Sequence, residues 1–238
     1  MAKKLLTLLQ VYGIILMAAI GHAQGMDHSL WDGLLQRHVS QTGRVDYVGF
    51  KTDSIELLQY LDTLTAHLEQ VNSWDKPQQL AFWINAYNAC TVNLICSNWP
   101  VESIKDLSRP WKQIVLKSKN SALSLDAIEH EILRQLEEPR IHFAINCASE
   151  SCPKLANRAY DGQHLEEQLK QATIDFLSDA SKNNFTPERL YLSRIFLWFK
   201  RDFGRTKDLI DLINQHTGKS FSEKIAISYL PYDWSINQ

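Results

Sequence analysis

The chain has 238 residues, a net charge of −2, 45% hydrophobic residues and seven tryptophans. This composition is typical of a globular protein of one or two domains and excludes a disordered chain. Basic residues form no long run, and the slight negative charge leaves nucleic-acid binding without electrostatic support.

The first 23 residues have the pattern of a secretory signal peptide. Lys3 and Lys4 precede an apolar stretch over residues 5–20, and a Gly-His-Ala tripeptide ending at Ala23 is typical of a cleavage site. Polar residues interrupt the stretch, which is also too short for a stable membrane span of about 20 apolar residues. We therefore expect cleavage after Ala23, export to the periplasm or the extracellular space, and a mature protein of residues 24–238 with no membrane span.

Two helices are predicted at the start of the mature chain. The first spans about Ser29–Gln41, where leucines recur at helical spacing until Gly43. The second follows Asp53, which forms a capping-box pattern with Glu56 ahead of another run of leucines at helical spacing.

The next helix, predicted over Gln78–Ser97, is apolar nearly all the way round. Such a pattern is typical of a helix buried at the centre of a domain. Asn85 and Asn88 interrupt it, three residues apart and on one face. Because asparagine is a poor helix former, a buried pair should be hydrogen-bonded, either within a functional site or to loops that cross the helix.

A weak alternation around residues 119–120 predicts a β-hairpin, and a short helix is predicted over Asp126–Leu136. On a helical wheel Glu129 falls inside the apolar stripe of this helix, whereas His130 falls well outside it. A carboxylate on an apolar face needs a partner, because burying an unpaired charge is very costly.

A short strand is predicted over Ile141–Ile145, apolar on both faces except for His142. It runs into a loop of small and polar residues, 146–153, which we call the thiol loop because it contains Cys147 and Cys152. If the strand simply continued, His142 and Cys147 would point to opposite faces, so the chain must turn at the start of the loop for them to meet.

The remaining predicted elements are three helices and two strands, over residues 165–177, 195–203, 207–216, 190–192 and 225–230. The whole pattern predicts an α+β fold that is predominantly helical, in which six or seven helices surround a small sheet containing Ile141–Ile145. No repeat or linker interrupts residues 24–238, which favours a single globular domain.

Four separated segments stand out along the chain: FWINAYNA over residues 82–89, IEHEILR over 128–134, HFAINCASESCP over 142–153 and LSRIFLWFKRDF over 192–203. In this order they resemble the family known as domain of unknown function 547. The resemblance covers about residues 80–203, and the closing Tyr-Asp-Trp at 232–234 also looks like the family. It implies a shared domain in which these motifs matter, and the family supplies no established reaction.

Cys147 is the candidate nucleophile of a thiol hydrolase or acyltransferase acting on an amide or ester. A thiol has a pKa of about 8.5 and needs a neighbouring base or cation to become a thiolate. We expect His142 to be that base, and His130 is the alternative because it comes from another element.

A site of this kind would draw on several elements. Asn85, Asn88 or Glu129 would orient the imidazole, and the backbone N–H groups of Ala148 and Ser149 would form an oxyanion hole. We therefore expect these side chains to converge on the thiol loop. The ligand would be a small molecule, a peptide or a component of the cell envelope, and no cofactor is implied.

The two cysteines of the thiol loop also have a non-catalytic interpretation. Four residues separate Cys147 from Cys152, and an oxidising compartment favours a disulfide between them. The protein would then be an exported binding or structural domain whose loop is locked by that bond. A metal site formed by both cysteines with His130 and His142 is disfavoured by the spacing, and we expect no metal.

The polar residues have structural interpretations as well. The two asparagines of the central helix can cap crossing loops, and His142 can be a hydrogen-bonded core histidine. Glu129 can form an internal salt bridge with Arg134 or Arg140.

Overall fold

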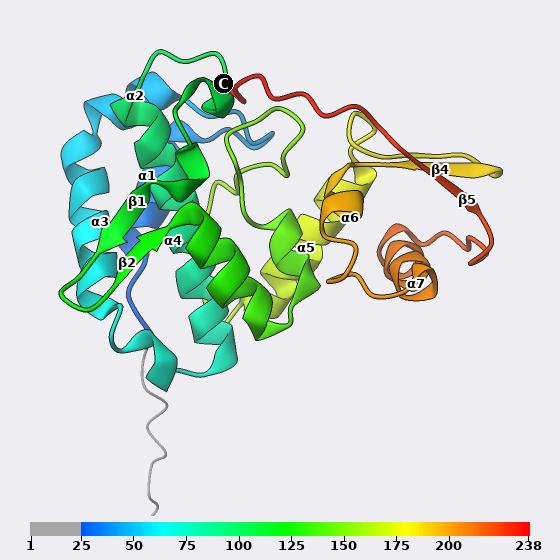
Figure 1. The fold of residues 1–238 in the computed structure, drawn as a ribbon, viewed down its shortest axis with the longest axis horizontal. Coiled ribbons are helices and arrows are strands. Elements are labelled where there is room, and N and C mark those ends of the chain that lie inside the picture. Colours follow the sequence, from blue (N-terminus) through cyan, green and yellow to red (C-terminus); the bar gives the residue numbers. More distant parts are fainter. Residues whose placement is uncertain (1–24) are drawn as a thin grey trace, which may run out of the picture.

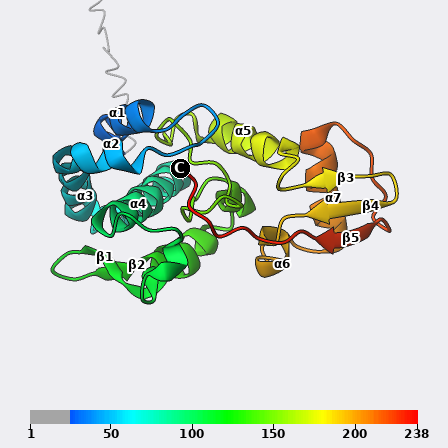
Figure 2. The same cartoon turned by 90° about the horizontal axis from the view of Figure 1, so that it is seen from above.

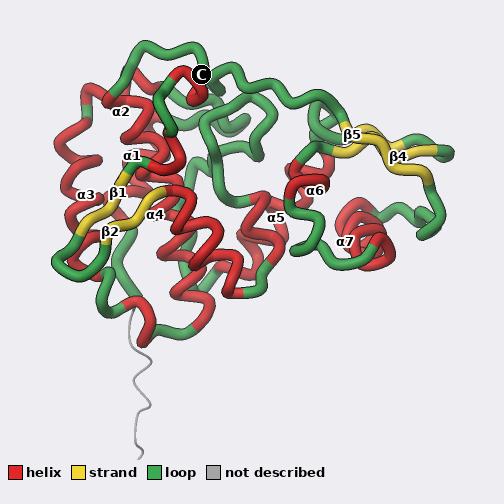
Figure 3. Tube along the Cα trace, in the orientation of Figure 1, coloured by secondary structure: helices red, strands yellow, loops and turns green. Residues whose placement is uncertain are grey.

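The computed structural model describes residues 25–238, so the predicted signal peptide lies outside the described residues. Helices dominate, and two small sheets lie at opposite ends of the molecule (Figure 1, Figure 3). The predicted α+β, predominantly helical fold is confirmed. Within the described residues, no helix combines the length and the apolar character needed to cross a membrane.

The larger lobe consists of four helices and one hairpin: α1 (Ser29–His38), α2 (Tyr47–Thr52), α3 (Ser54–His67), α4 (Lys76–Ser97), β1 (Ile114–Lys117) and β2 (Ala122–Ser124). The predicted central helix is α4, whose side chains are buried almost without interruption from Leu80 to Cys96. Asp75 caps its start, because its side chain accepts a hydrogen bond from the backbone of Gln78, and proline in the first turn also favours this start. Figure 2 shows α4 between the N-terminal helices and the predicted hairpin, in which β1 and β2 pair antiparallel.

The smaller lobe contains α5 (Leu165–Ser178), α6 (Ile195–Trp198), α7 (Thr206–Thr217), β3 (Asn184–Phe185), β4 (Arg189–Leu192) and β5 (Ala226–Tyr229). The middle strand, β4, pairs antiparallel with β3 and parallel with β5. Phe143, Phe176 and Phe196 belong to an apolar cluster that is distinct from the core around α4. The last helix, α7, ends at Gly218, which has the left-handed conformation favoured by glycine.

The predicted strand over Ile141–Ile145 is wrong. The chain forms a 3₁₀-helix over Pro139–Phe143 instead, and its last three side chains are all buried. A short apolar run fits a buried helical turn as well as a buried strand, so periodicity cannot separate the two. Proline at the first position of the turn favours the helix, because its fixed φ is helical and it has no N–H to satisfy there.

The predicted helix over Asp126–Leu136 also has an unexpected form. It is a π-helical segment over Ala127–Ile132, followed by a 3₁₀ turn over Leu133–Leu136. Similarly, the helix expected over residues 195–203 stops at Trp198 as α6. Single π-helical turns are frequent at functional sites, so the residues on this segment are candidates for a functional role.

Residues 230–238, here called the C-terminal tail, leave β5 and cross back to the larger lobe (Figure 1). Their backbone pairs with the thiol loop, because Glu150 and Ser151 donate to the carbonyls of Ser235 and Asp233. Further along the tail, Ile236 donates to the carbonyl of Glu102. The thiol loop is therefore held between the central helix and the end of the chain.

We predict that Asn85→Ala lowers the free energy of unfolding by about 2–4 kcal/mol. The buried amide of Asn85 donates to the carbonyl of Tyr160 at 2.8 Å and accepts from its N–H at 2.9 Å, and both backbone groups would lose their partner. Guanidinium denaturation measures the loss. The control is Asn120→Ala in the exposed turn of the hairpin, with an expected change below about 0.5 kcal/mol. Equal losses in the two variants would contradict this account of Asn85.

Candidate active site

A pocket of about 260 Å³ lies between the two lobes, where the thiol loop meets the C-terminal tail. Six aromatic side chains line it: Tyr87, Trp111, Trp198, Phe199, Tyr232 and Trp234. Four of them form a connected wall, because the ring of Tyr232 lies 4.7 Å from that of Trp198 and 4.5 Å from that of Trp234, and the ring of Trp234 lies 5.8 Å from that of Trp111, centroid to centroid. The other lining residues include the carboxyls of Asp126 and Glu129, two histidines and both thiols of the thiol loop. The pocket therefore combines an apolar wall with groups that can react.

The thiol loop turns sharply at its start. The side chain of Asn146 donates to the carbonyl of Pro153 at 2.7 Å and accepts from the N–H of Ala148 at 2.8 Å, so one amide spans the loop. Ala148 is buried and has a left-handed backbone with φ of 61°. Non-glycine residues adopt this conformation at a cost of about 1–2 kcal/mol, and such strain is concentrated at functional sites.

The sulfur of Cys147 lies among groups that favour its thiolate. It is 2.8 Å from the sulfur of Cys152, 3.2 Å from the hydroxyl of Ser149 and 3.4 Å from the hydroxyl of Tyr232. Contact with the Cys152 thiol, and then these hydroxyls, outweigh the effect of burial and lower the pKa of Cys147. Burial and the neighbouring Cys147 raise the pKa of Cys152 well above its ordinary value. Cys147 is therefore the thiol that ionises first.

Both cysteines of the thiol loop are thiols in the structure. Their separation of 2.8 Å is longer than the disulfide bond length of about 2.05 Å. The alternative disulfide of the sequence analysis is thus not present at bonding distance.

The predicted oxyanion hole is not formed as expected, because the N–H of Ala148 donates to the side chain of Asn146 at 2.8 Å. This N–H is therefore not left to bind a substrate oxygen. Sequence alone indicated small residues but not the direction of their N–H groups.

His142 is buried, with 2% of its surface exposed, and its ring stacks on Phe199 at 3.9 Å between centroids. Its Nε2–H donates to Asp202 at 2.7 Å, and Arg134 binds both oxygens of the same carboxylate at 2.6 and 2.7 Å. Burial lowers the pKa of His142 although Asp202 opposes the shift, so the ring is neutral at pH 7. Burial also acts to raise the pKa of Asp202, but its bonds from His142 and Arg134 outweigh this and hold the pKa well below its usual range.

The other ring nitrogen of His142, Nδ1, is buried and has no hydrogen-bond partner. The nearest carboxyl oxygen, on Glu129, is 3.9 Å away, which is too far for a hydrogen bond. Both residues line the pocket with Cys147, but His142 makes no hydrogen bond to the sulfur among the described contacts. The expected thiol–imidazole pair is therefore not formed.

Glu129 occupies the π-helical segment and is 8% exposed, as the helical wheel predicts. Burial and then the charge of Cys147 raise its pKa to about 8, although Arg134 opposes the shift. The predicted salt bridge is wrong, because Arg134 pairs with Asp202 and Arg140 pairs with two other glutamates. The carboxyl of Glu129 consequently keeps its proton at neutral pH.

The two asparagines of α4 do not line the pocket. Asn85 binds the backbone of Tyr160, and Asn88 donates to the carbonyl of Ala144 at 3.0 Å while accepting from the N–H of Asn146 at 2.8 Å. Neither orients His142, so that expected role is wrong for both. The side chain of Asn88 instead holds the backbone at the start of the thiol loop.

His130 is exposed at the pocket and its Nδ1 is 3.2 Å from a guanidinium nitrogen of Arg134. It has no hydrogen bond to Cys147 among the described contacts. Asp202 is the residue that orients His142, and Tyr232 supplies a hydroxyl that contacts the sulfur of Cys147. Neither residue is predicted from the sequence to have a role, although both lie in segments that carry the family resemblance.

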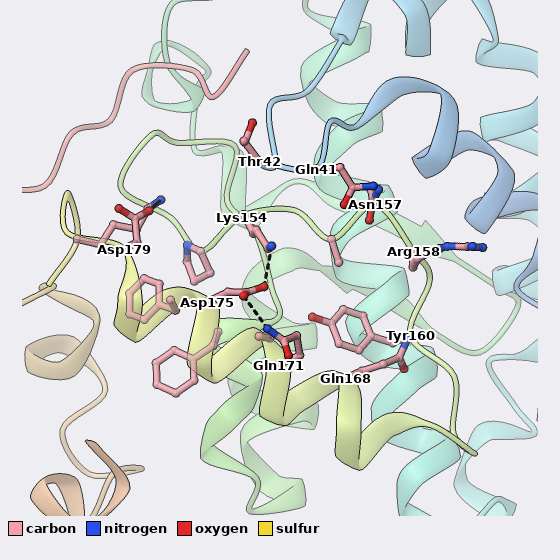
Figure 4. Close-up of a pocket in the computed structure, with 16 residues that line it drawn as sticks. Gln41, Thr42, Lys154, Asn157, Arg158, Tyr160, Gln168, Gln171, Asp175 and Asp179 are labelled. Carbon is pink, nitrogen blue, oxygen red and sulfur yellow. Dashed lines mark hydrogen bonds and ion pairs between the residues drawn. The ribbon is translucent and has the colours of Figure 1, made fainter. Parts of the chain in front are cut away.

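A second pocket, of about 380 Å³, lies between α5 and the segment after the thiol loop (Figure 4). Its acidic side chains are paired, because Asp175 contacts Lys154 at 2.6 Å and Gln171 at 2.8 Å, and Asp179 contacts Lys182 at 2.6 Å. The described residues that line it include no cysteine, serine or histidine. Reactive groups are thus concentrated in the smaller pocket.

Metal binding has no arranged site in the part of the chain that the structure describes. No three histidine, cysteine, aspartate or glutamate side chains of residues 25–238 are placed together to hold an ion.

The sequence model of the family described as "Protein of unknown function, DUF547" matches residues 71–177. The resemblance is confirmed over this range, which includes α4, the π-helical segment and the thiol loop. The match ends before the segment 192–203, which contributes Asp202 to the site, and before the tail that contributes Tyr232. No curated protein and no solved structure matches the chain.

We predict that the rate of reaction of reduced Cys147 with iodoacetamide reaches half its maximum at a pH below about 8.5. An ordinary thiol reaches this midpoint at about pH 8.5, which is its pKa. Tyr232→Phe should raise this midpoint by about one pH unit, because a hydrogen bond to a charged group contributes about 1.5 kcal/mol. Peptide mass spectrometry follows alkylation of Cys147 alone. Tyr229→Phe, a tyrosine of β5 away from the thiol, is the control and should leave the profile unchanged. An unshifted profile in Tyr232→Phe would remove this hydroxyl from the account of the thiol.

We also predict that Glu129→Gln stabilises the protein in a pH-dependent way. The pKa of Glu129 is higher in the folded protein than its ordinary value of 4.5, so its ionisation disfavours the fold. Stability of the wild type is therefore lost as pH rises from about 4.5 to about 8, and the uncharged variant avoids this loss. Unfolding free energies should coincide near pH 4 and differ by roughly 4 kcal/mol at pH 8. Glu131→Gln, on the exposed side of the segment, should show no such trend.

Proposed function

We propose that the protein is a cysteine-dependent hydrolase or acyltransferase acting on an ester or amide, with Cys147 as nucleophile. One observation supports this most strongly: in a single aromatic pocket the pKa of a thiol is lowered while that of a carboxyl, Glu129, is raised to about 8. Near neutral pH the nucleophile, whose pKa is lowered to about 7, is then partly ionised while Glu129 still holds most of its proton. Titratable groups whose environments push their pKa values apart are typical of acid–base catalysis.

In the first half of the proposed reaction, the Cys147 thiolate attacks the carbonyl carbon and a carbon–sulfur bond forms. The hydroxyl of Tyr232, 3.4 Å from the sulfur, is in reach of the oxygen that becomes negatively charged. Glu129 transfers its proton to the leaving alcohol or amine as that bond breaks. The product is an acyl thioester on Cys147.

In the second half, the Glu129 carboxylate takes a proton from water, and the hydroxide attacks the thioester. The acid product leaves, the thiolate of Cys147 is restored and Glu129 is again protonated. A second alcohol or amine in place of water would give acyl transfer. The aromatic wall of the pocket suits an acyl group with an apolar or aromatic part.

His142 is a positioning residue in this proposal. Its bond to Asp202, and the bidentate bond of Asp202 to Arg134, hold a neutral ring beside Glu129. Because the ring is buried and uncharged, it places no positive charge beside Glu129 that would lower the pKa of this carboxyl. This role replaces the role of base that the sequence suggested for it.

We propose that this chemistry takes place outside the cytoplasm, on a small molecule, a peptide or a component of the cell envelope. The support is the signal-peptide pattern of residues 1–23. Mass analysis of the protein purified from its native compartment should find Gln24 at the N-terminus. A chain that retains residues 1–23 would refute the proposed cleavage.

A second candidate function has one observation in its favour. The sulfurs of Cys147 and Cys152 are only 2.8 Å apart, so an oxidising compartment could join them in a disulfide that locks the loop of a non-catalytic binding domain. Peptide mapping without reductant separates the two candidates. A quantitative disulfide in the exported protein that resists mild reductants would favour the binding domain over the hydrolase.

We predict that the wild type hydrolyses nitrophenyl esters with transient acylation of Cys147, detected by intact-mass spectrometry, and that Cys147→Ala abolishes both. Glu129→Gln should slow deacylation and lower amide hydrolysis by about 10²–10³-fold. Acylation by nitrophenyl esters should change far less, because nitrophenolate leaves without a proton. The matched control, Glu131→Gln, should behave as the wild type. Hydrolysis that survives in Cys147→Ala would sink the proposal.

A further inference from the structure

The geometry points to a second activity for the same loop: Cys147 and Cys152 form an attacking and a resolving thiol for exchange with organic disulfides. This activity does not depend on the proposed ester or amide chemistry, because it needs neither a carbonyl substrate nor proton transfer by Glu129. It also differs from a permanent structural bond, because the disulfide between the two cysteines would be an intermediate that forms and is reduced again.

The two thiols have unequal access to the pocket. Cys147 is partly exposed, whereas Cys152 is 5% exposed and its sulfur accepts the backbone N–H of Cys147 at 2.9 Å. An incoming disulfide therefore meets Cys147 first. The sulfur of Cys152 is already 2.8 Å from that of Cys147, so forming a bond of about 2.05 Å needs a movement of less than about 1 Å.

Hydrogen-bond donors surround the sulfur pair. The hydroxyls of Tyr232 and Ser149 lie 3.4 and 3.2 Å from the sulfur of Cys147 and are placed to donate to it. The backbone N–H of Cys147 donates to Cys152. Exchange needs a thiolate at each attack, and these donors stabilise negative charge on both sulfurs in turn.

The proposed exchange runs in two balanced steps. The Cys147 thiolate attacks one sulfur of the substrate disulfide, a mixed disulfide forms on Cys147, and the other half leaves as a thiolate that takes up a proton from solvent. Cys152 then attacks the sulfur of Cys147, the mixed disulfide bond breaks, and the proton of Cys152 passes to the second half, which leaves as a thiol. The substrate disulfide is reduced by two electrons, and the two cysteines are oxidised to a disulfide. A dithiol of the same compartment reverses the steps and restores the reduced loop.

The pocket also indicates which disulfides would be accepted. Its wall is aromatic, Trp198 presents 44% of its surface, and its acidic lining residues are Asp126 and Glu129. Neither lysine nor arginine is among the described residues that line it. A neutral disulfide with aromatic or apolar groups beside the sulfurs is therefore favoured over an anionic one such as oxidised glutathione.

The test uses reduced, desalted protein and the neutral aromatic disulfide dithiodipyridine, whose reduction releases a coloured thiopyridone. The wild type should release two equivalents per chain and retain no adduct, and its peptide map should contain a Cys147–Cys152 disulfide. Cys152→Ser should release one equivalent and keep the probe on Cys147, and Cys147→Ser should release none. Cys90→Ala, which removes a buried thiol of α4, is the control and should release two.

Two results would overturn the inference. One is a wild type that retains the probe on Cys147 after a single release, and the other is separate adducts on both cysteines. Mass analysis of the wild type alone distinguishes these outcomes, so the test holds even where a variant does not fold. Oxidised glutathione should react at least about tenfold more slowly than dithiodipyridine, relative to their rates with free cysteine. These stoichiometries do not depend on ester hydrolysis. A protein that shows no esterase activity should still release two equivalents, so the two proposals can fail separately.

Discussion

Three buried asparagine amides connect the central helix, the thiol loop and the C-terminal tail. Asn88 on α4 accepts from the backbone N–H of Asn146, and the side chain of Asn146 accepts from the amide of Asn237 at 3.3 Å. Asn237 in turn accepts from the buried hydroxyl of Tyr47 at 2.7 Å. Leaving a buried amide without a partner lowers the stability of the fold by more than one hydrogen bond contributes to it. Removing one of these amides would therefore destabilise the groups that bind it. The position of the two sulfurs of the thiol loop depends on this chain of amides.

The strained backbone of the thiol loop is held by the same contacts. Ala148 adopts a left-handed conformation that it would not keep in a free loop, and its N–H is bound by Asn146. On the other side, the backbone of Glu150 and Ser151 pairs with the C-terminal tail. That tail also carries Tyr232 to the sulfur of Cys147. One segment therefore fixes the loop, closes the aromatic wall and supplies a hydrogen-bond donor, and this explains why residues so far apart in the chain form one site.

Sequence patterns predicted the parts of the molecule in which local periodicity decides the structure. An apolar helix with two amides at α4, and a carboxyl on the apolar side of the segment at Glu129, are both visible in a short window of residues. The run at 141–145 was misassigned because both a buried strand and a buried 3₁₀ turn are apolar on every side. The roles of Asp202 and Tyr232 cannot be predicted from the sequence, because they come from tertiary contacts. Asp202 lies 60 positions from His142, and Tyr232 lies 85 positions from Cys147. No local spacing records such contacts.

The pocket holds more potential negative charge than its apolar surroundings can stabilise at once. The charge of Cys147 raises the pKa of Glu129, and by reciprocity an ionised Glu129 disfavours the Cys147 thiolate. Near neutral pH the two groups therefore tend to carry one negative charge between them, as coupled acids do. Asp202 does not add to this repulsion to the same extent, because Arg134 and His142 bind its carboxylate directly. A thiolate beside a protonated carboxyl is the pair that the proposed acyl transfer would use. The sulfur of Cys152, 2.8 Å from that of Cys147, is the partner that the proposed disulfide exchange would use. Both proposals depend on the low polarity of the pocket more than on any single residue.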